Sequence, residues 1–333
     1  MISDEEVERL QAWLHANVGT PDEALDVSVI SGGASNLTLG VDVGGRRLVV
    51  RRPPIGHFLP TAHDMSREHT VYAALAGTGV PVPEALGLCS DESVLSAPFY
   101  VMTRVDGVVP HDVEALSGVA EAANAVTARD YVDVLARIHA LDVDAIGLGG
   151  FAKRSGYLER QVGRWVEQWE RSKVVDTPTV DALAARLRAH LPEQAETTLV
   201  HGDYRLGNVM LSPAGDGSIV AVFDWEMATL GDPLADIGYA LLYWGTKDRP
   251  TFHPSQGIAE LPGFMDGTAL VSAYADASGR DCTLVPFHLV LAAFKLAIIG
   301  EGARARAIRN GHPDPFGGRG ANPLVEWALE IQL

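Results

Sequence analysis

The stretch that decides the fold runs from Leu199 to Glu226 and reads LVHGDYRLGNVMLSPAGDGSIVAVFDWE. Two apolar runs of β-type residues, Val209–Leu211 and Ile219–Phe223, flank a turn rich in Ser, Pro, Gly and Asp. Apolar runs on either side of such a turn predict a β-hairpin.

Polar residues cluster at the ends of these two runs. Asp203 and Asn208 precede the first predicted strand, and Asp224 directly follows the second. Because a hairpin brings such ends together, two carboxylates and an amide oxygen should converge on one small volume. Oxygen ligands of this kind suit Mg²⁺, which proteins hold with one or two carboxylates plus substrate phosphates. Asp203 is then left to accept a proton from a hydroxyl, as phosphoryl transfer requires.

Each of these residues taken alone is more often a turn residue than a catalytic one. The combination is far more specific. H-G-D, four residues, Asn, a strand and then Asp reproduces the layout of the protein-kinase catalytic loop and its magnesium-binding Asp, with H-G-D in place of H-R-D.

The composition describes an ordinary globular chain. The sequence has 333 residues, 47% hydrophobic and 21% charged, and a formal net charge of −17. This length allows two lobes with sizeable cores. The acidic balance argues against nucleic acid or an anionic membrane as the main partner.

Two cysteines, Cys89 and Cys282, provide neither a disulfide framework nor a zinc pattern, so we expect a reduced, cytoplasmic protein. The acidic N-terminus lacks the apolar core of a signal peptide. The longest apolar run, residues 284–299, is interrupted by Pro286, His288 and Lys295, and we expect no membrane span.

The first 104 residues predict an N-lobe with an antiparallel sheet. The expected helices and strands are helix Ser3–Asn17, strands Val27–Ile30, Leu37–Val43 and Arg46–Arg51, helix Ser66–Ala76, and strands Glu84–Leu88 and Phe99–Thr103. A glycine-rich loop containing Gly32, Gly33, Ser35 and Asn36 follows the first strand. Such a loop suits a phosphate, although an ordinary hairpin loop is equally compatible with the pattern.

Residues 105–333 predict a mainly helical C-lobe around the hairpin. The expected helices are Thr127–Leu141, Ser155–Arg171, Pro178–His190, Pro233–Trp244 capped by Asp232, Met265–Ser278, Leu284–Ile299, Gly300–Ile308 and Asn322–Ile331. His139 is expected to be packed or hydrogen-bonded within the core. Asp236 could complement the helix dipole or tether the catalytic loop.

These motifs, together with R-R-P-P, S-R-E-H, P-V-P, P-F-Y-V-M and D-W-E-M-A-T-L-G-D-P-L-A-D, resemble the aminoglycoside phosphotransferase-like (choline kinase-like) superfamily. The resemblance covers nearly the whole chain. It is strongest to the branch of kinase-like domains found beside acyl-CoA dehydrogenase domains in larger proteins. It implies an α+β, bilobal, protein-kinase-like fold and an ATP-dependent, Mg²⁺-assisted kinase.

The resemblance also implies roles for matching residues. Asp203 would orient and deprotonate the acceptor hydroxyl, and His201 and Asp236 would hold its loop by hydrogen bonds. Asn208 and Asp224 would bind Mg²⁺, with Glu226 reaching the metal directly or through water. The glycine-rich loop would cover the phosphates. The backbone of Met102, Thr103, Arg104 and Val105 would form the hinge against the adenine; the motifs do not distinguish ATP from GTP.

The chain departs from the family pattern at one position. Arg51 stands where the family has a nucleotide-binding Lys, and Glu68 would pair with it. Arg keeps the charge and can bind phosphate in a bidentate manner, but its geometry differs from that of Lys. We interpret Arg51 as a variation that retains nucleotide binding. The alternative is a catalytically weak nucleotide-binding module, and a regulatory protein kinase fits less well because the interval after Asp224 is too short for a long activation loop.

The sequence says least about the acceptor, which we expect to be a small molecule with a hydroxyl group, bound by a monomer or homodimer. Arginines at 304, 306 and 309 favour an anionic or amphipathic acceptor, such as a hydroxyacyl compound, over a cationic aminoglycoside. The alternative for these arginines is a solvated helix face. The acceptor site is expected to be lined by Tyr157, Trp165, Tyr204, Trp225, Tyr243, Trp244 and residues 301–306.

Overall fold

The computed structural model describes residues 2–31, 36–54, 64–173, 177–245, 256–314, 320 and 322–333. The chain divides into two compact units, one of residues 1–107 and 220–226, the other of residues 108–219 and 227–333. The sequence-based boundary at residue 104 lies close to residue 107. It did not anticipate that residues 220–226 belong to the first unit.

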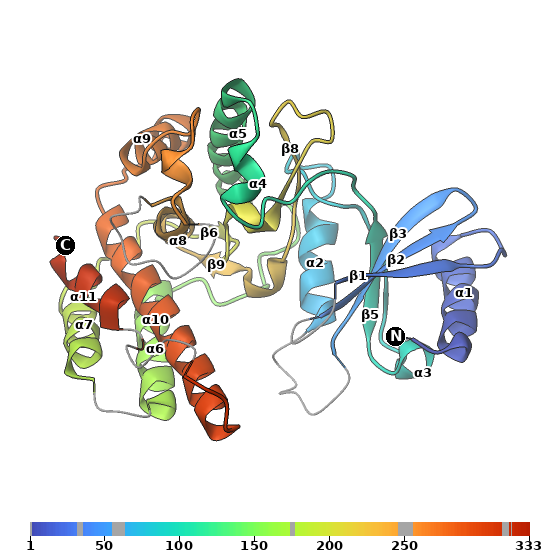
Figure 1. The fold of residues 1–333 in the computed structure, drawn as a ribbon, viewed down its shortest axis with the longest axis horizontal. Coiled ribbons are helices and arrows are strands. Elements are labelled where there is room, and N and C mark those ends of the chain that lie inside the picture. Colours follow the sequence, from blue (N-terminus) through green and yellow to red (C-terminus); the bar gives the residue numbers. More distant parts are fainter. Residues whose placement is uncertain are drawn as a thin grey trace. The chain divides into compact units, whose positions relative to one another are not determined.

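The first unit is built on a five-stranded antiparallel sheet in the order β1-β2-β3-β5-β4 (Figure 1). The strands are β1 (Asp26–Ser31), β2 (Leu37–Val43), β3 (Arg46–Arg52), β4 (Ala85–Cys89) and β5 (Phe99–Thr103). The predicted turn between β2 and β3 is formed by Gly44 and Gly45, which both have positive φ. Glycine adopts these angles without steric cost.

Two helices cover opposite faces of this sheet (Figure 1). Helix α1 (Asp4–Val18) begins with the predicted Ser3–Glu6 capping box. It packs into the core of the sheet face that carries Phe99 and Val101. Helix α2 (Met65–Leu75) lies on the other face, where Tyr72 contacts Tyr100. A short helix, α3 (Glu92–Leu95), packs beside α1.

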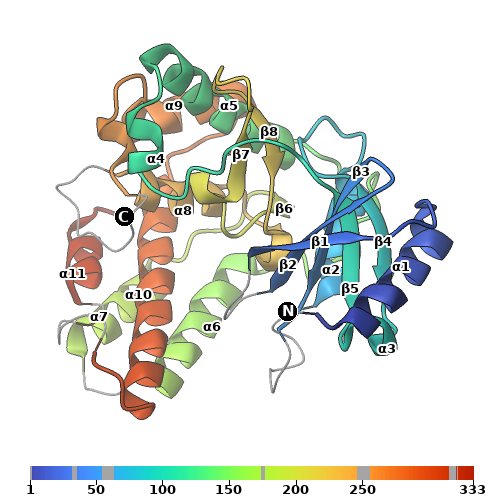
Figure 2. The ribbon, with the colours of Figure 1, turned by 45° about the vertical axis from the view of Figure 1, so that its right-hand side comes forward.

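The second unit is mainly helical. Its helices are α4 (Glu114–Ser117), α5 (Glu121–His139), α6 (Tyr157–Ser172), α7 (Pro178–Ala189), α8 (Leu234–Trp244), α9 (Gly267–Ser278), α10 (Val285–Arg309) and α11 (Asn322–Glu330). Figure 2 shows α10 running lengthwise beside α6, and it also packs against α7, α8 and α11. This helix is therefore the centre of the unit.

Helix α10 corrects two expectations. Residues 285–309 form one helix, where the sequence predicted two that meet at residues 299 and 300. Pro286 does not interrupt it, because proline lies in the first turn, where its missing N–H has no partner to lose. By length and composition alone the helix is long and apolar enough to cross a membrane. However, 72% of its most apolar window is buried inside the protein, as in the core helix of a soluble protein.

The predicted hairpin is confirmed as a two-stranded sheet of β7 (Val209–Leu211) and β8 (Ile219–Val222). Its turn is closed by the Ser212 N–H, which donates to the Ser218 carbonyl at 2.8 Å. A second small sheet, β6 (Thr198–Val200) with β9 (Thr229–Gly231), was not predicted. Three-residue strands are too short to show a clear alternation in sequence.

Candidate active site

The predicted catalytic loop, His201–Asp203, follows β6 and precedes a short 3₁₀ turn, Leu206–Asn208. Gly202 has a φ of +82°, and a Cβ atom there would lie 2.7 Å from the Met227 carbonyl oxygen. A side chain would therefore be strained by both the backbone angle and the contact. The glycine of H-G-D is a requirement of the loop's shape.

Asp236, near the start of α8, holds this loop from below. Its carboxylate accepts the His201 N–H at 2.7 Å and the Gly202 N–H at 2.8 Å. His139 Nε2 lies 3.1 Å from the same carboxylate, and the Tyr274 hydroxyl lies 2.7 Å from His139 Nδ1. Of the two roles predicted for Asp236, the tether is the one observed, and His139 is hydrogen-bonded core as expected.

The charge of Asp236 is matched by these partners. Complete burial would raise the pKa of its carboxyl, since burial disfavours the charged form. The hydrogen bond and charge of His139, the charge of His201 and the Gly202 N–H outweigh burial, so that the pKa of Asp236 lies below its ordinary value. The loop is thus fixed to a buried carboxylate.

Asp203 is fixed by residues close to it in the chain. The Asn208 amide nitrogen donates to the Asp203 carbonyl at 2.9 Å and to the Asp203 carboxylate at 2.7 Å. The Asp203 N–H donates to His201 Nδ1 at 3.2 Å. Because the amide nitrogen of Asn208 makes both bonds, the amide oxygen is the atom that can serve as a metal ligand.

Three further side chains surround the Asp203 carboxylate. Arg205 Nε lies 3.5 Å from it, and the Arg205 guanidinium stands 5.7 Å from the centre of the Tyr243 ring. The Tyr239 hydroxyl lies 3.1 Å from that of Tyr243. Burial, reinforced by the negative charge of Asp203, raises the pKa of Tyr239 well above its ordinary value. The neighbourhood of Asp203 is therefore aromatic and cationic.

Within the first unit, Arg51 on β3 joins the other predicted charges. It forms an ion pair with Glu68 of α2, and its second nitrogen lies 3.3 Å from Asp224 Oδ1. The predicted Arg51–Glu68 pairing is observed. Burial would lower the pKa of Arg51, but the negative charge of Glu68, with Asp224 and two tyrosines, raises it well above its ordinary value.

Asp224 itself has a backbone conformation that is rare for a residue with a side chain. Its φ is +64°, in the left-handed region. Asp tolerates this region better than most residues, but the conformation still stores strain, which proteins retain most often at functional sites. Glu226, two residues later, is exposed in the 3₁₀ turn Trp225–Met227.

The predicted base and metal ligands belong to different units: Asp203 and Asn208 lie in the second, and Asp224 and Glu226 lie in the first. Their convergence remains a prediction. Among the described residues, no group of three or more His, Cys, Asp and Glu side chains could hold a metal. This does not exclude Mg²⁺, which proteins usually hold with only one or two carboxylates plus substrate phosphates.

Two backbone N–H groups of the predicted hinge are bonded within the first unit. The Thr103 N–H donates to the Glu84 carbonyl and the Arg104 N–H to the Arg47 carbonyl, both at 3.0 Å. These donors hold the sheet together and are not available to an adenine. Met102 lies within β5, the strand between β3 and β4, which leaves Val105 as the residue of the predicted hinge beyond these sheet contacts.

Of the predicted phosphate loop, Gly32, Gly33 and Ser35 lie outside the described residues. Asn36 is described, immediately before β2. It is 3% exposed, and among the described residues neither its amide nitrogen nor its amide oxygen has a hydrogen-bond partner. Buried polar groups are nearly always paired.

Several predicted acceptor-lining residues are instead core. Tyr204 and Tyr131 exchange bonds, with each hydroxyl donating to the other's carbonyl, at 2.9 and 3.0 Å. The Trp244 indole donates to the Met265 carbonyl at 2.7 Å, and Trp225 is fully buried. An aromatic residue near a motif can line a binding site or belong to the core, and the sequence pattern alone does not separate these two roles.

The three arginines of α10 differ in their surroundings. Arg304 Nε lies 2.8 Å from Asp314, and the same guanidinium lies 3.3 Å from Glu301, so that its charge is matched within the helix region. Arg306 and Arg309 are exposed in the last turn, where basic residues complement the helix dipole. The solvated-face interpretation is therefore correct for these two.

Residues that the sequence analysis did not select also contribute. Lys295 of α10 donates to the Gly202 carbonyl at 2.7 Å, and Tyr239 and Arg205 flank Asp203. The sequence did contain one signal: a lysine within an otherwise apolar helix is costly to bury and needs a partner.

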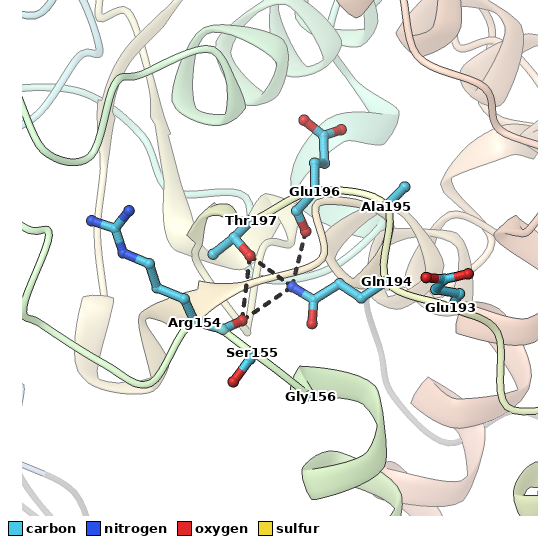
Figure 3. Close-up of a pocket in the computed structure, with 8 residues that line it drawn as sticks. All are labelled: Arg154, Ser155, Gly156, Glu193, Gln194, Ala195, Glu196 and Thr197. Atoms are coloured by element: carbon cyan, nitrogen blue, oxygen red, sulfur yellow. Dashed lines mark hydrogen bonds between the residues drawn. The ribbon is translucent and has the colours of Figure 1, made fainter.

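A pocket of about 430 Å³ lies elsewhere in the second unit, lined by residues 154–156 and 193–197 (Figure 3). Gln194 stands at its centre and donates to the Arg154 carbonyl, the Glu196 carbonyl and the Thr197 hydroxyl. Its amide oxygen accepts the Tyr157 N–H at the start of α6. The polar groups of the pocket therefore bond one another, and Gln194 has a structural role, since it accepts a hydrogen bond from the first turn of α6.

Comparisons with known proteins agree with this geometry. A model of the phosphotransferase enzyme family matches residues 26–271. Acyl-CoA dehydrogenase family member 11 of Gallus gallus is 37% identical over 324 residues, which cover 93% of this chain but only 41% of that protein. The chain thus spans less than half the length of this relative.

Solved structures share the fold. A protein of Ralstonia eutropha, provisionally described as an aminoglycoside phosphotransferase, is 33% identical, with a TM-score of 0.84 over 98% of this chain and 99% of that one. Aminoglycoside phosphotransferase APH(4)-Ia, solved with ADP and hygromycin B, is 19% identical with a TM-score of 0.63, covering 96% and 97% of the two chains. The fold is that of the protein-kinase-like phosphotransferases, and the chain belongs to the phosphotransferase enzyme family.

Proposed function

We propose that the protein transfers the γ-phosphoryl group of ATP to a hydroxyl group of a small molecule, with Asp203 as the catalytic base. The observation that carries this proposal is the fixation of Asp203. Its carboxylate is oriented by Asn208 and its loop by Asp236, at hydrogen-bond distances of 2.7–2.9 Å. Phosphoryl transfer depends mainly on such positioning and on charge stabilisation.

In this reaction the acceptor oxygen forms a bond to the γ-phosphorus as the bond to the β-phosphate oxygen breaks, and ADP leaves. The acceptor's proton passes to the Asp203 carboxylate. Arg51, held by Glu68, would bind phosphate oxygens. The donor set fits Mg²⁺, since Asn208 offers an amide oxygen and Asp224 a partly exposed carboxylate. When bound, the metal would neutralise the charge of the phosphates.

The test is ADP release from ATP and Mg²⁺ by the full chain and by the Asp203→Ala and Asp224→Ala variants. We expect both variants to stay folded and to lose turnover by at least about 100-fold. Wild-type turnover in either variant would contradict the proposal. If the wild type bound ATP without turning it over, it would be a nucleotide-binding module, as the replacement of the family Lys by Arg51 would then suggest.

We infer further that the acceptor is a hydroxyacyl-type compound. Two charged side chains beside Asp203 in the second unit are basic, since Arg205 lies 3.5 Å away and Lys295 contacts the preceding residue, whereas the carboxylate of Asp236 is already engaged by the loop N–H groups and His139. A cationic aminoglycoside would require carboxylates there, whereas an anionic acceptor gains from the basic side chains. The Gallus gallus relative's name, acyl-CoA dehydrogenase family member 11, supports an acyl compound.

An aminoglycoside acceptor is the second candidate, favoured by the description of the Ralstonia eutropha protein. Initial rates of ADP release with hydroxyacyl thioesters, free hydroxy acids and aminoglycosides decide between them. We expect the thioesters to give the highest kcat/KM. A preference for aminoglycosides would overturn the inference about the acceptor and leave the phosphotransfer proposal intact.

A further inference from the structure

Lys295 lies in the middle of α10, between stretches of buried apolar residues. Burial lowers the pKa of its amine, and the negative charges of Asp203 and Asp236, which would raise that pKa, only partly offset the effect of burial. A charged group in such surroundings is costly unless it is hydrogen-bonded and paired. Its contacts therefore indicate what the charge is for.

The ammonium group makes three contacts within the second unit. It donates to the Gly202 carbonyl oxygen at 2.7 Å. It also stands 4.4 Å from the centre of the Tyr239 ring and 6.0 Å from that of Trp165. Aromatic faces stabilise a cation at these distances. The two rings thus hold the ammonium in one place, and the hydrogen bond is directed at the catalytic loop.

Lys295 completes the fixation of the Gly202 backbone. The Gly202 N–H is held by Asp236 at 2.8 Å and the Gly202 carbonyl by Lys295 at 2.7 Å. That carbonyl belongs to the peptide group that joins Gly202 to Asp203. Because a peptide group is planar, holding its oxygen limits the orientation of the Asp203 backbone and hence of its side chain.

We propose that Lys295 is a positioning residue of the catalytic loop, which fixes the Gly202–Asp203 peptide so that the Asp203 carboxylate faces the acceptor hydroxyl. Lys295 acts through this peptide and not by contact with the reacting atoms. The inference rests on the proposed role of Asp203. A merely structural lysine would support the packing of α10 without affecting turnover.

The experiment compares full-length variants by ADP release from ATP and Mg²⁺, with water as the acceptor until the acceptor is known. Lys295→Met keeps the length of the side chain and removes its charge and donors. Lys295→Arg restores both with a different geometry. Arg164→Met is the matched control, because Arg164 is an exposed cation whose guanidinium also stands near the Trp165 ring, at 5.4 Å, whereas the Gly202 carbonyl is bonded by Lys295.

We expect Lys295→Met to lower kcat by about 10- to 100-fold, as small misplacements of catalytic groups do, and to leave the KM for ATP within about twofold. Lys295→Arg should recover part of the loss, and Arg164→Met should stay within about twofold of wild type. In Lys295→Ala, added ethylammonium should restore activity by occupying the place of the amine, whereas a chain that had lost its fold would not respond.

A folded Lys295→Met variant with wild-type kcat would overturn the inference. So would parallel losses of kcat and thermal stability in the Met and Arg variants with no recovery by ethylammonium. Asp203→Ala, measured in parallel, separates the two proposals. If Asp203→Ala retains turnover, the proposed function fails. If it loses turnover while Lys295→Met does not, only the role of Lys295 fails.

Discussion

The catalytic loop and the Arg51 cluster are held in different ways. The loop is fixed through its backbone, whose N–H groups bond Asp236 and whose Gly202 carbonyl bonds Lys295. The cluster of Arg51, Glu68 and Asp224 (the Arg51 cluster) is fixed by contacts between side chains. The Asp224 side chain there is 30% exposed.

This difference follows from what each region is proposed to do. A catalytic base must point in one direction, and backbone hydrogen bonds restrict direction more firmly than long side chains can. Groups that receive a charged ligand must exchange partners when it arrives, so partly exposed side chains such as Asp224, which can rearrange, suit this role. Three substitutions, ordered by expected effect, probe this contrast.

Asp236→Asn should give the largest effect. The Asn side chain has only one acceptor oxygen, so its amide nitrogen would face either the His201 or the Gly202 N–H group and that hydrogen bond would be lost. Breaking a buried charged network costs about 3–5 kcal/mol. At about 2 °C per kcal/mol, the melting temperature should fall by roughly 6–10 °C. The kcat should fall by at least about 100-fold, as expected for a misplaced catalytic group.

Asp232→Asn is the matched control. Asp232 is also buried at the start of α8 and also lies near a histidine, His288, at 3.4 Å, but it accepts the Leu234 N–H and no loop group. It should lower stability while leaving kcat nearly unchanged. An equal loss of kcat in both variants would show that the loop depends on the general integrity of α8.

The lowered pKa of Asp236 also predicts that its contribution to stability depends on pH. Because the folded-state pKa of Asp236 lies below its ordinary value, the stability it confers is present above the pKa of an unfolded Asp, about 3.9. It is lost as the pH falls through the folded-state value. The difference in melting temperature between wild type and Asp236→Asn should therefore narrow below about pH 4. A difference that stays constant into acid would contradict this assignment.

Arg51→Lys should give an intermediate effect. One ammonium cannot reach both Glu68 and Asp224 as the forked guanidinium does, although it keeps the charge. We expect the KM for ATP to rise by about tenfold, with a smaller change in kcat. Arg47 lies on the same strand as Arg51 and forms an exposed ion pair with Asp106, and Arg47→Lys should change neither constant. A kcat loss as large as that of Asp236→Asn would remove the contrast between the regions.

Tyr131→Phe should give the smallest effect. It removes the hydroxyl that bonds the buried Tyr204 carbonyl, which costs about 1–3 kcal/mol. Tyr204→Phe should cost less, because the Tyr131 carbonyl lies inside α5 and can keep a helical partner. Urea unfolding measures both. A larger loss for Tyr204→Phe would contradict this reasoning.

Residues close together in the chain were the ones that the sequence could predict. The hairpin, the capping box of α1 and the spacing of Asp203, Asn208 and Asp224 depend on local patterns. The Arg51–Glu68 pair was reached through family resemblance and is observed. Apart from α5 and the division of α10, the predicted first residues of the helices lie within a few residues of the observed ones.

Contacts between distant segments could not be predicted. Lys295 follows Gly202 by 93 positions, and nothing in an apolar run indicates which carbonyl its lysine will reach. Tyr204 and Trp244 were expected at the acceptor site because they are aromatic and lie in or near the catalytic loop and the helices after it. Their contacts with distant residues show that they are core. Helix α5 begins six residues before the predicted Thr127, at Glu121, because its first turns are packed by the rest of the unit.

The length and apolar character of α10 affect how the protein behaves when it unfolds. When the second unit opens, a 25-residue helix that is buried over most of its length presents its apolar side chains to water and to other chains. Exposed segments of this kind drive aggregation. We expect heat denaturation to be irreversible and the protein's persistence to be governed by its rate of unfolding, with chaperones shielding this segment during synthesis.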